Sequence, residues 1–164
     1  MVNRNTRGFS LLEIAIVVTI IGILASLAIP AFAQLTKRSR FSTLANDLRQ
    51  YSGAMQTFAM ENGQYPDTHS AHGVFVPGME DLLSTSWLEK SPVGGRYEWV
   101  YTTQPDPVER DAYVQIVETG ANPFNMTLSD IVELDEDIDD GNIATGFLQV
   151  AGARIRHFSQ LSAP

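Results

Sequence analysis

The first third of the chain is dominated by one long apolar run. No charged residue occurs between Ile14 and Thr36, and inside the run Thr19, Ser26 and Gln34 are plainly polar. A helix needs about 20 apolar residues to cross a hydrocarbon core that is about 30 Å thick. The pattern therefore predicts a membrane-spanning helix close to the N-terminus.

Apolar residues continue beyond this run, but at alternating steps of three and four residues. They are Phe41, Leu44, Leu48, Tyr51, Met55 and Phe58. This spacing places them on one face of an amphipathic helix, and a stripe this short favours packing on the protein's own sheet over a coiled coil. Asn62-Gly63 is a good helix stop. We therefore expect one continuous helix from Phe9 to about Met60, with a spanning half over residues 9–36 and an amphipathic half over residues 37–62.

The rest of the chain, residues 63–164, reads as a β-rich head domain. Alternating apolar and polar residues predict two antiparallel hairpins, because such alternation gives a strand one buried face. A connector rich in Gly, Pro and Ser precedes the hairpins and should lie on the surface, with one short helical piece and with Trp87 and Leu88 holding it to the core. The strands are expected at Arg96–Thr103 and Ala112–Glu118, joined by Gln104–Pro107, and at Gly146–Val150 and Ala153–Phe158; the short helix is expected at Met79–Leu88. The fold class is α+β: a long N-terminal helix packed on a small antiparallel sheet.

A second helix is expected at Met126–Asp140, and its end is strongly acidic. Acids in residues 130–142 suggest either a solvated acidic face or a calcium site, since Ca²⁺ prefers oxygen ligands. EF-hand spacing fails, because counting from Asp135 places Asp140 where that loop needs glycine and Gly146 where it needs an acid. Solvated charge is favoured, so no cofactor is assigned and calcium stays a minor alternative.

Composition narrows the function further. The chain has 164 residues, a formal net charge of −8 and no cysteine. An acidic chain is poorly suited to neutralise phosphates, so direct nucleic-acid binding is not expected. Without cysteine there is neither a disulfide nor a thiolate metal site. His69 and His72 lack a third ligand of matching spacing, and solvated histidines are favoured.

No catalytic constellation is found. The sequence contains no nucleophile elbow, phosphate loop or positioned carboxylate pair, so no enzyme activity is expected. Asn125-Met126-Thr127 fits a glycosylation sequon, which matters only in a host with the enzyme.

Glu13 stands at the start of the apolar run. A carboxylate at the centre of a spanning helix costs about 2.5 to 3.5 kcal/mol on insertion scales, and such residues are usually functional. The plain alternative is that Glu13 sits among lipid headgroups and only marks the end of the span.

The residues around Glu13 carry a specific resemblance. The stretch Gly8-Phe9-Ser10-Leu11-Leu12-Glu13 resembles the processing site of type IV pilins and type II secretion pseudopilins. The resemblance implies a leader at residues 1–8, cleavage between Gly8 and Phe9 by a prepilin peptidase, N-methylation of Phe9, and a filament-assembly role for Glu13. The family also carries a glycine and a proline that match Gly22 and Pro30, and proline inside a helix predicts a kink or a locally melted turn.

The implied function is that of a structural filament subunit. Its partners would be other pilin or pseudopilin subunits, the prepilin peptidase, an inner-membrane assembly platform with its ATPase, and lipid before assembly. It would be a single-pass protein of the inner membrane, with the N-terminus cytoplasmic and the head extracytoplasmic, and would then enter a filament. Arg4 and Arg7 agree with this orientation by the positive-inside tendency, whereas Lys37, Arg38 and Arg40 argue against it.

The competing reading is an ordinary signal peptide. Ala31-Phe32-Ala33 resembles an A-x-A cleavage site, and cleavage after Ala33 would release a secreted soluble binding domain. Signal peptides have apolar regions of about 7 to 15 residues, shorter than this run.

Overall fold

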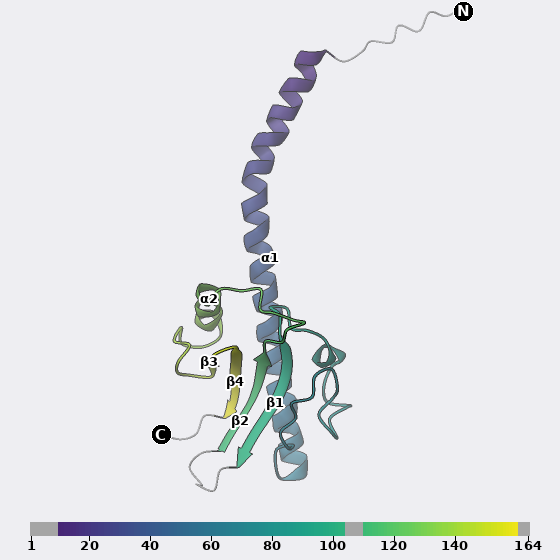
Figure 1. The fold of residues 1–164 in the computed structure, drawn as a ribbon, viewed down its shortest axis with the longest axis vertical. Helices are drawn as coiled ribbons and strands as arrows, with labels where there is room; N and C mark the ends of the chain where they lie inside the picture. Colours follow the sequence, from purple (N-terminus) through teal and green to yellow (C-terminus); the bar gives the residue numbers. More distant parts are fainter. Residues whose placement is uncertain (1–9, 104–109, 161–164) are drawn as a thin grey trace, which may run out of the picture. The chain divides into compact units, whose positions relative to one another are not determined.

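The computed structural model describes residues 10–103 and 110–160 (Figure 1). Within them the elements follow the order helix, short helix, hairpin, helix, hairpin. Their bounds are α1 Leu11–Asn62, the 3₁₀ helix η1 Thr85–Leu88, β1 Arg96–Thr103, β2 Arg110–Val117, α2 Leu128–Ile138, β3 Leu148–Val150 and β4 Arg154–Gln160. The chain divides into two compact units, Met1–Ser39 and Arg40–Pro164, and α1 contributes to both. From here on, "head domain" means this second unit, which adds the part of α1 after Ser39 to the β-rich region at residues 63–164.

Helix α1 has 52 residues and ends at Asn62, close to the predicted end. Gly63 terminates it with a φ of 77°, a conformation that glycine adopts without a steric penalty. The helix is continuous through Pro30, so the turn does not melt there. Because proline has no N–H, the carbonyl of Ser26 loses its usual helical donor. A kink at Gly22 or Pro30 stays a prediction.

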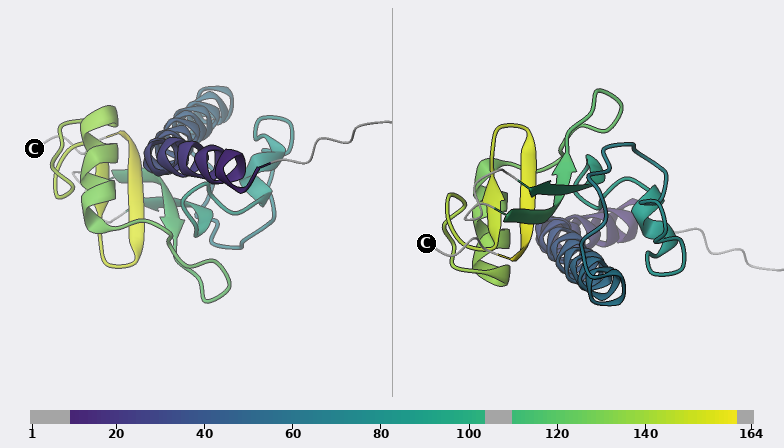
Figure 2. Two further views of the ribbon diagram at one scale, coloured as in Figure 1. Left: turned by 90° about the horizontal axis from the view of Figure 1, so that it is seen from above. Right: turned by 90° about the horizontal axis from the view of Figure 1, so that it is seen from below.

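The four strands form one antiparallel sheet in the order β1-β2-β4-β3. Both predicted hairpins are present, as β1 with β2 and as β3 with β4. The central pairing, β2 with β4, joins the hairpins, and its register sets Ile116 opposite Ile155. The predicted loop Gln104–Pro107 lies outside the described residues. The sheet covers one side of the head-domain part of α1 (Figure 2).

The core of the head domain is the interface between α1 and this sheet. Five of the six residues in the amphipathic stripe are buried, and Phe58 is half-buried. They pack against every second residue of the strands, because alternate residues of a strand point to the same face of the sheet. The buried residues of the stripe are Phe41, Leu44, Leu48, Tyr51 and Met55, and the strand partners include Tyr97, Trp99, Val114, Ile116, Leu148 and Ile155. The predicted packing of this stripe on the protein's own sheet is confirmed.

The connector between α1 and β1 differs from its prediction. It is not only a surface segment, because Val76, Met79, Leu83 and Trp87 are buried in the core. Its only regular helix is η1, which starts later than the predicted Met79. Trp87 does anchor it, as predicted: the indole stacks on Tyr97 with ring centroids 5.8 Å apart, and its Nε1 donates to the Val74 carbonyl.

We expect the head domain to fold without the spanning segment. Every buried core residue that the structure describes lies at position 41 or later, and residues 41–164 carry six basic and 18 acidic side chains. A fragment that lacks residues 1–34 should therefore be soluble and monomeric. Circular dichroism and a cooperative thermal transition would check this. An unfolded or aggregated fragment would show that the described core is insufficient.

Candidate functional site

The N-terminal half of α1 presents its apolar side chains to the outside. Leu11 is 92% exposed, and Leu27, Ile29 and Phe32 are each about 70% exposed. Among the described residues, α1 is the one helix that is long and apolar enough to cross a membrane, and no residue of that apolar window is buried. Exposed apolar surface on this scale needs lipid or other subunits to cover it.

The hydroxyl groups inside this apolar segment are satisfied locally. Thr19 Oγ1 donates to the Ala15 carbonyl over 2.7 Å, and Ser26 Oγ donates to the Ile23 carbonyl over 2.7 Å. These bonds let hydroxyl groups enter an apolar environment at little cost. Gly22 lies among them, and a Cβ built there meets nothing within 4 Å. The isolated chain therefore does not require glycine at position 22.

Glu13 is the exception, since it brings a charge into the first turn of α1. It makes no ion pair or hydrogen bond with another described residue. The Leu12 N–H donates to Ser10 Oγ over 3.3 Å, so Ser10 caps the helix just before Glu13. Unpaired N–H groups at this end favour a carboxylate. Gly8 and Phe9, the predicted cleavage and methylation residues, lie outside the described residues.

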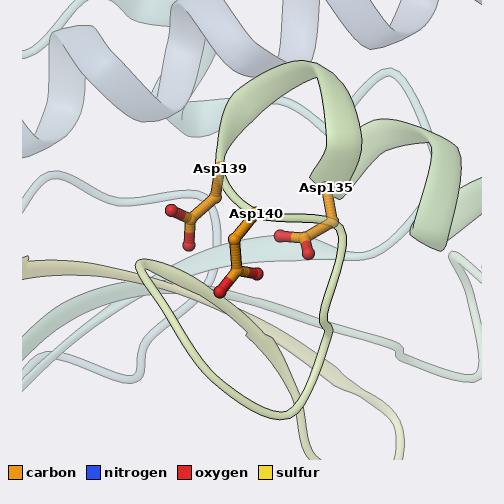
Figure 3. A group of neighbouring side chains, drawn as sticks. All are labelled: Asp135, Asp139 and Asp140. Carbon is orange, nitrogen blue, oxygen red and sulfur yellow. The ribbon is translucent and has the colours of Figure 1, made fainter.

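A second candidate site lies at the end of α2. One carboxylate oxygen from each of Asp135, Asp139 and Asp140 can be chosen so that all lie within 4.8 Å of one another (Figure 3). Asp139 is fixed by the backbone, because its Oδ2 accepts from the N–H groups of Phe147 and Leu148. Gly146 permits this approach, since a Cβ there would overlap the same carboxylate. Asp140 Oδ1 accepts from the Asn142 N–H over 2.8 Å.

Asp135 corrects the prediction of a solvated acidic face. It is 0% exposed, and neither of its carboxylate oxygens has a hydrogen-bond partner among the described residues. Burial, together with the neighbouring charges of Asp139 and Asp140, raises the pKa of Asp135 to about 6. Three carboxylates around one point, one of them buried and unpaired, fit a hard divalent cation such as Ca²⁺. When bound, such a cation would neutralise the cluster.

We expect calcium to stabilise the protein through this cluster. Millimolar CaCl₂ should raise the thermal midpoint by several degrees relative to EDTA, because a ligand that binds only the folded state shifts unfolding. Asp135→Asn should abolish that shift. Asp137→Asn, at an exposed position outside the cluster, is the matched control and should keep it. Equal midpoints of the wild type in calcium and EDTA would contradict the site.

In EDTA the same cluster should make stability depend on pH. The folded-state pKa of Asp135 lies above its unfolded value, so the folded state binds more protons between about pH 4 and pH 6. Its contribution to the free energy of unfolding therefore increases as pH falls through about 6. Asp135→Asn removes that contribution, so the stability difference between wild type and variant should change across this window.

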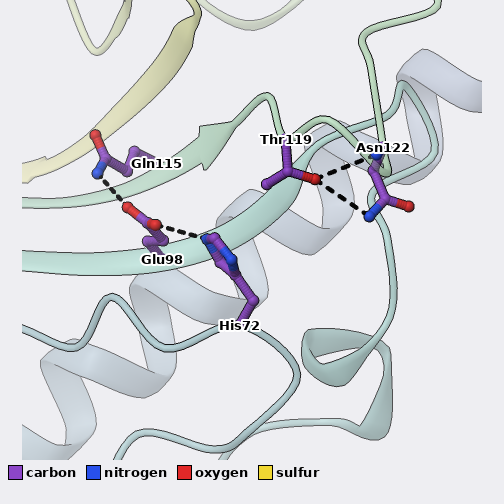
Figure 4. A network of polar contacts seen from close by, with 5 residues as sticks. All are labelled: His72, Glu98, Gln115, Thr119 and Asn122. Carbon is purple, nitrogen blue, oxygen red and sulfur yellow. Dashed lines mark hydrogen bonds and ion pairs between the residues drawn. The ribbon is translucent and has the colours of Figure 1, made fainter.

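His69 and His72 make different contacts. His72 Nε2 lies 2.6 Å from Glu98 Oε1, and Glu98 also accepts from Gln115 Nε2 over 2.6 Å (Figure 4). His69 instead pairs through its backbone with Trp99, and its Nε2 is buried without a hydrogen-bond partner among the described residues, so the expectation of a solvated side chain is wrong for His69. Local sequence patterns did not predict the buried Glu98–Gln115 pair. Its signal was a cross-strand pair of polar residues at matching positions of two predicted strands.

One residue of the predicted sequon, Thr127, makes a structural hydrogen bond. Asn125 is exposed, and Thr127 is the N-cap of α2, where its hydroxyl accepts from the Asp130 N–H over 3.3 Å. Figure 4 also shows the neighbouring turn, closed by Thr119 and Asn122. Glycosylation at Asn125 stays a prediction.

Comparison with known proteins agrees with the N-terminal motif. Residues 3–29 match the family model described as the prokaryotic N-terminal methylation motif. The type IV major pilin protein PilA of Myxococcus xanthus is 43% identical over 75 residues, which are 46% of this chain and 34% of PilA. The type II secretion system core protein G of Klebsiella pneumoniae is 28% identical over 148 residues, which are 85% of this chain and 97% of that protein.

A solved structure supports the fold. The major type IV pilin PilA1 from Clostridium difficile matches with a TM-score of 0.55 and 16% identity, over 77% of this chain and 97% of that one. The match to PilA spans only about a third of PilA. The motif, the exposed apolar helix and the helix-on-sheet head thus make the chain similar to type IV pilins and type II secretion pseudopilins, with the prokaryotic N-terminal methylation motif and a pilin-like fold.

Proposed function

We propose that this chain is a filament subunit that is inserted into the inner membrane, processed between Gly8 and Phe9, methylated at Phe9 and assembled through α1. Similarity to the pilins implies assembly with other pilin subunits, and the exposed apolar segment fits membrane anchoring before assembly. The N-terminus is cytoplasmic and the head is extracytoplasmic. Cleavage and assembly are carried out by separate proteins: the prepilin peptidase, the assembly platform and its ATPase.

The observation that carries the proposal is the contrast between Glu13 and the residues that follow it. The hydroxyl groups in the apolar segment are satisfied within the helix, whereas the Glu13 carboxylate has no partner among the described residues. When helices bundle, a lone charge leaves water and headgroups and needs a partner charge. Cleavage after Gly8 creates one, the amine of Phe9, either in the same helix or in a neighbouring subunit. The second arrangement would also fix the axial register of the filament.

Processing can be tested directly. The intact mass of protein purified from the native membrane should correspond to residues 9–164 plus one methyl group. A mature N-terminus at Gln34 would establish the signal-peptide reading instead.

The alternative, a secreted binding domain, differs in its membrane behaviour. Its cleavage site, Ala33-Gln34, lies inside continuous helix in this structure. Fractionation separates the two functions: the filament subunit should stay in the membrane pellet until detergent is added, whereas a released domain would be soluble in buffer.

Within the family, the extent of similarity favours a secretion pseudopilin over a pilus subunit. The match to core protein G of Klebsiella pneumoniae covers 97% of that protein, whereas the match to PilA covers 34% of PilA. Deleting the gene in its host and comparing the extracellular proteome with surface motility tests this. Loss of exported proteins with normal motility is the expected result, and the converse would assign the chain to a pilus.

A further inference from the structure

The head domain contains a polar hollow on the side of α1 that faces the connector. It has a volume of about 440 Å³ and lies between α1, the residues after η1, and the segment around Asn122. Two basic side chains line it, Arg40 from α1 and Lys90 from the connector. Both are exposed, and neither makes an ion pair or a side-chain hydrogen bond with another described residue. Basic side chains are few in this domain, with six after position 40.

Two acids also line the hollow, and they differ in character. Asp47 is only 8% exposed and accepts a hydrogen bond from the Tyr97 hydroxyl over 2.8 Å. Burial raises the pKa of Asp47, so its negative charge is disfavoured there. Glu89 is exposed at the rim. The exposed charged side chains that line the hollow are therefore the two cations Arg40 and Lys90 and one anion, Glu89, in a chain whose net charge is −8.

The exposed acids of α2 form a surface of the opposite sign. Glu136 and Asp137 are exposed and make no hydrogen bond or ion pair with another described residue. No basic residue occurs between Arg110 and Arg154, so nothing in the local sequence neutralises them. Like charges on adjacent heads repel unless they meet a complementary surface.

The two surfaces belong to different elements: Lys90 lies in the connector, whereas Glu136 and Asp137 lie on α2. In all three views α2 is on one side of the head-domain part of α1, and the connector with η1 is on the other (Figures 1 and 2). A surface and its complement at different places on one subunit make a head-to-tail contact. Repeated contacts of this kind build an open helix when the rotation does not close a ring.

We infer that Glu136 and Asp137 of one subunit dock at the Arg40 and Lys90 hollow of the next copy of this chain. This inference rests on the proposed function as a filament subunit. It assigns the contact between heads, whereas α1 and Glu13 serve the contact between helices. Surface charge pairs are individually weak, so their role is to select the neighbouring surface and the register of the heads.

Cysteine crosslinking tests the contact in the full-length chain. The protein has no native cysteine, so every thiol crosslink comes from an introduced pair. Lys90→Cys combined with Asp137→Cys, treated with a short bismaleimide on membranes, should give a ladder of multimers. Lys90→Cys combined with Asp67→Cys, an exposed acid in the connector, is the matched control and should give no ladder.

Charge reversal tests the energetics. Lys90→Glu and Asp137→Lys should each lower the filament yield by about fivefold or more, because like charges then face each other. Combining them should restore the yield, since the pair is re-formed with its signs exchanged. Asp67→Lys changes the net charge as Asp137→Lys does and should leave the yield unchanged.

The outcomes separate this inference from the proposed function. If the wild type forms filaments, but the cysteine pair gives no ladder or the double reversal is no better than either single change, the docking contact is wrong and the filament function stands. If the wild type forms no filament when processed beside its assembly machinery, the proposed function fails first.

Discussion

Replacing Glu13 with glutamine should leave insertion and processing intact but reduce filament assembly by at least about tenfold. Glutamine keeps the shape of the side chain and removes its charge, so in the proposed pairing the Phe9 amine would lose the partner that offsets its desolvation. Removing one member of a buried ion pair typically costs about 3 to 5 kcal/mol, because the remaining charge is left uncompensated. The measurement is the amount of subunit in a sheared filament fraction, normalised to processed subunit in the membrane.

Glu13→Val tests whether assembly needs the carboxylate or only requires that position 13 enter the membrane easily. Valine lowers the cost of placing this position in lipid, so the variant should insert at least as well as the wild type. It should nevertheless assemble as poorly as Glu13→Gln, since neither offers a carboxylate. If both variants form filaments at wild-type yield with processing intact, the assembly role of Glu13 is wrong. If Glu13→Val alone assembles, the carboxylate is an obstacle to insertion and not a partner in the filament.

Sequence patterns predicted α1 and the strands well because one local rule governs each. The steps of three and four residues from Phe41 to Phe58 have the helical period, and Gly63 ends the helix by its own conformational freedom. The hairpins follow from alternation, which has the period of a strand. These signals do not depend on distant parts of the chain, so the sequence alone was sufficient to predict them.

The connector was predicted less well because tertiary contacts determine its path. Trp99 Nε1 donates to the Pro66 carbonyl over 2.9 Å, and the His69 and Trp99 backbones pair. Both contacts join residues about 30 positions apart, so no local spacing in the sequence predicts them. Composition rich in glycine, proline and serine indicated a loop but could not show that Val76 and Met79 fill the core.

The burial of Asp135 could have been predicted from the helical period of α2, but the high acidic content of the segment favoured a solvated face. Asp135 is four residues after Ile131 and three before Ile138, so it shares the inward face of α2. Counting acids predicted solvated charge, whereas counting helical turns places one acid inside. The cluster with Asp139 and Asp140 requires the fold of the loop that follows, which the sequence does not specify locally.

Trp99→Ala should destabilise the head domain by about 3 to 5 kcal/mol, the usual cost of truncating a buried tryptophan. Trp99 is 0% exposed, and its ring lies 5.6 Å from that of Tyr65, centroid to centroid. The change therefore opens a cavity and also releases the Pro66 carbonyl that the indole holds. Because a domain's total stability is about 5 to 15 kcal/mol, a loss of this size should make the head sensitive to protease.

The N-terminal unit, Met1–Ser39, should not be affected by the same substitution. Trp99 belongs to the Arg40–Pro164 unit, while the processing motif precedes α1 in the other unit. Trp99→Ala should therefore be inserted and lose its leader as the wild type does, and its head should then be degraded.

Trp99→Phe is the matched control. It retains most of the apolar volume and loses only the hydrogen bond, so it should lower the free energy of unfolding by about 1 to 3 kcal/mol and remain assembled. Chemical denaturation of the fragment without residues 1–34 gives the two stability losses, and immunoblots of membranes give processing. If Trp99→Phe is as stable as the wild type, the indole hydrogen bond does not hold the connector to the sheet. If Trp99→Ala blocks leader removal, the head and the processing site are coupled.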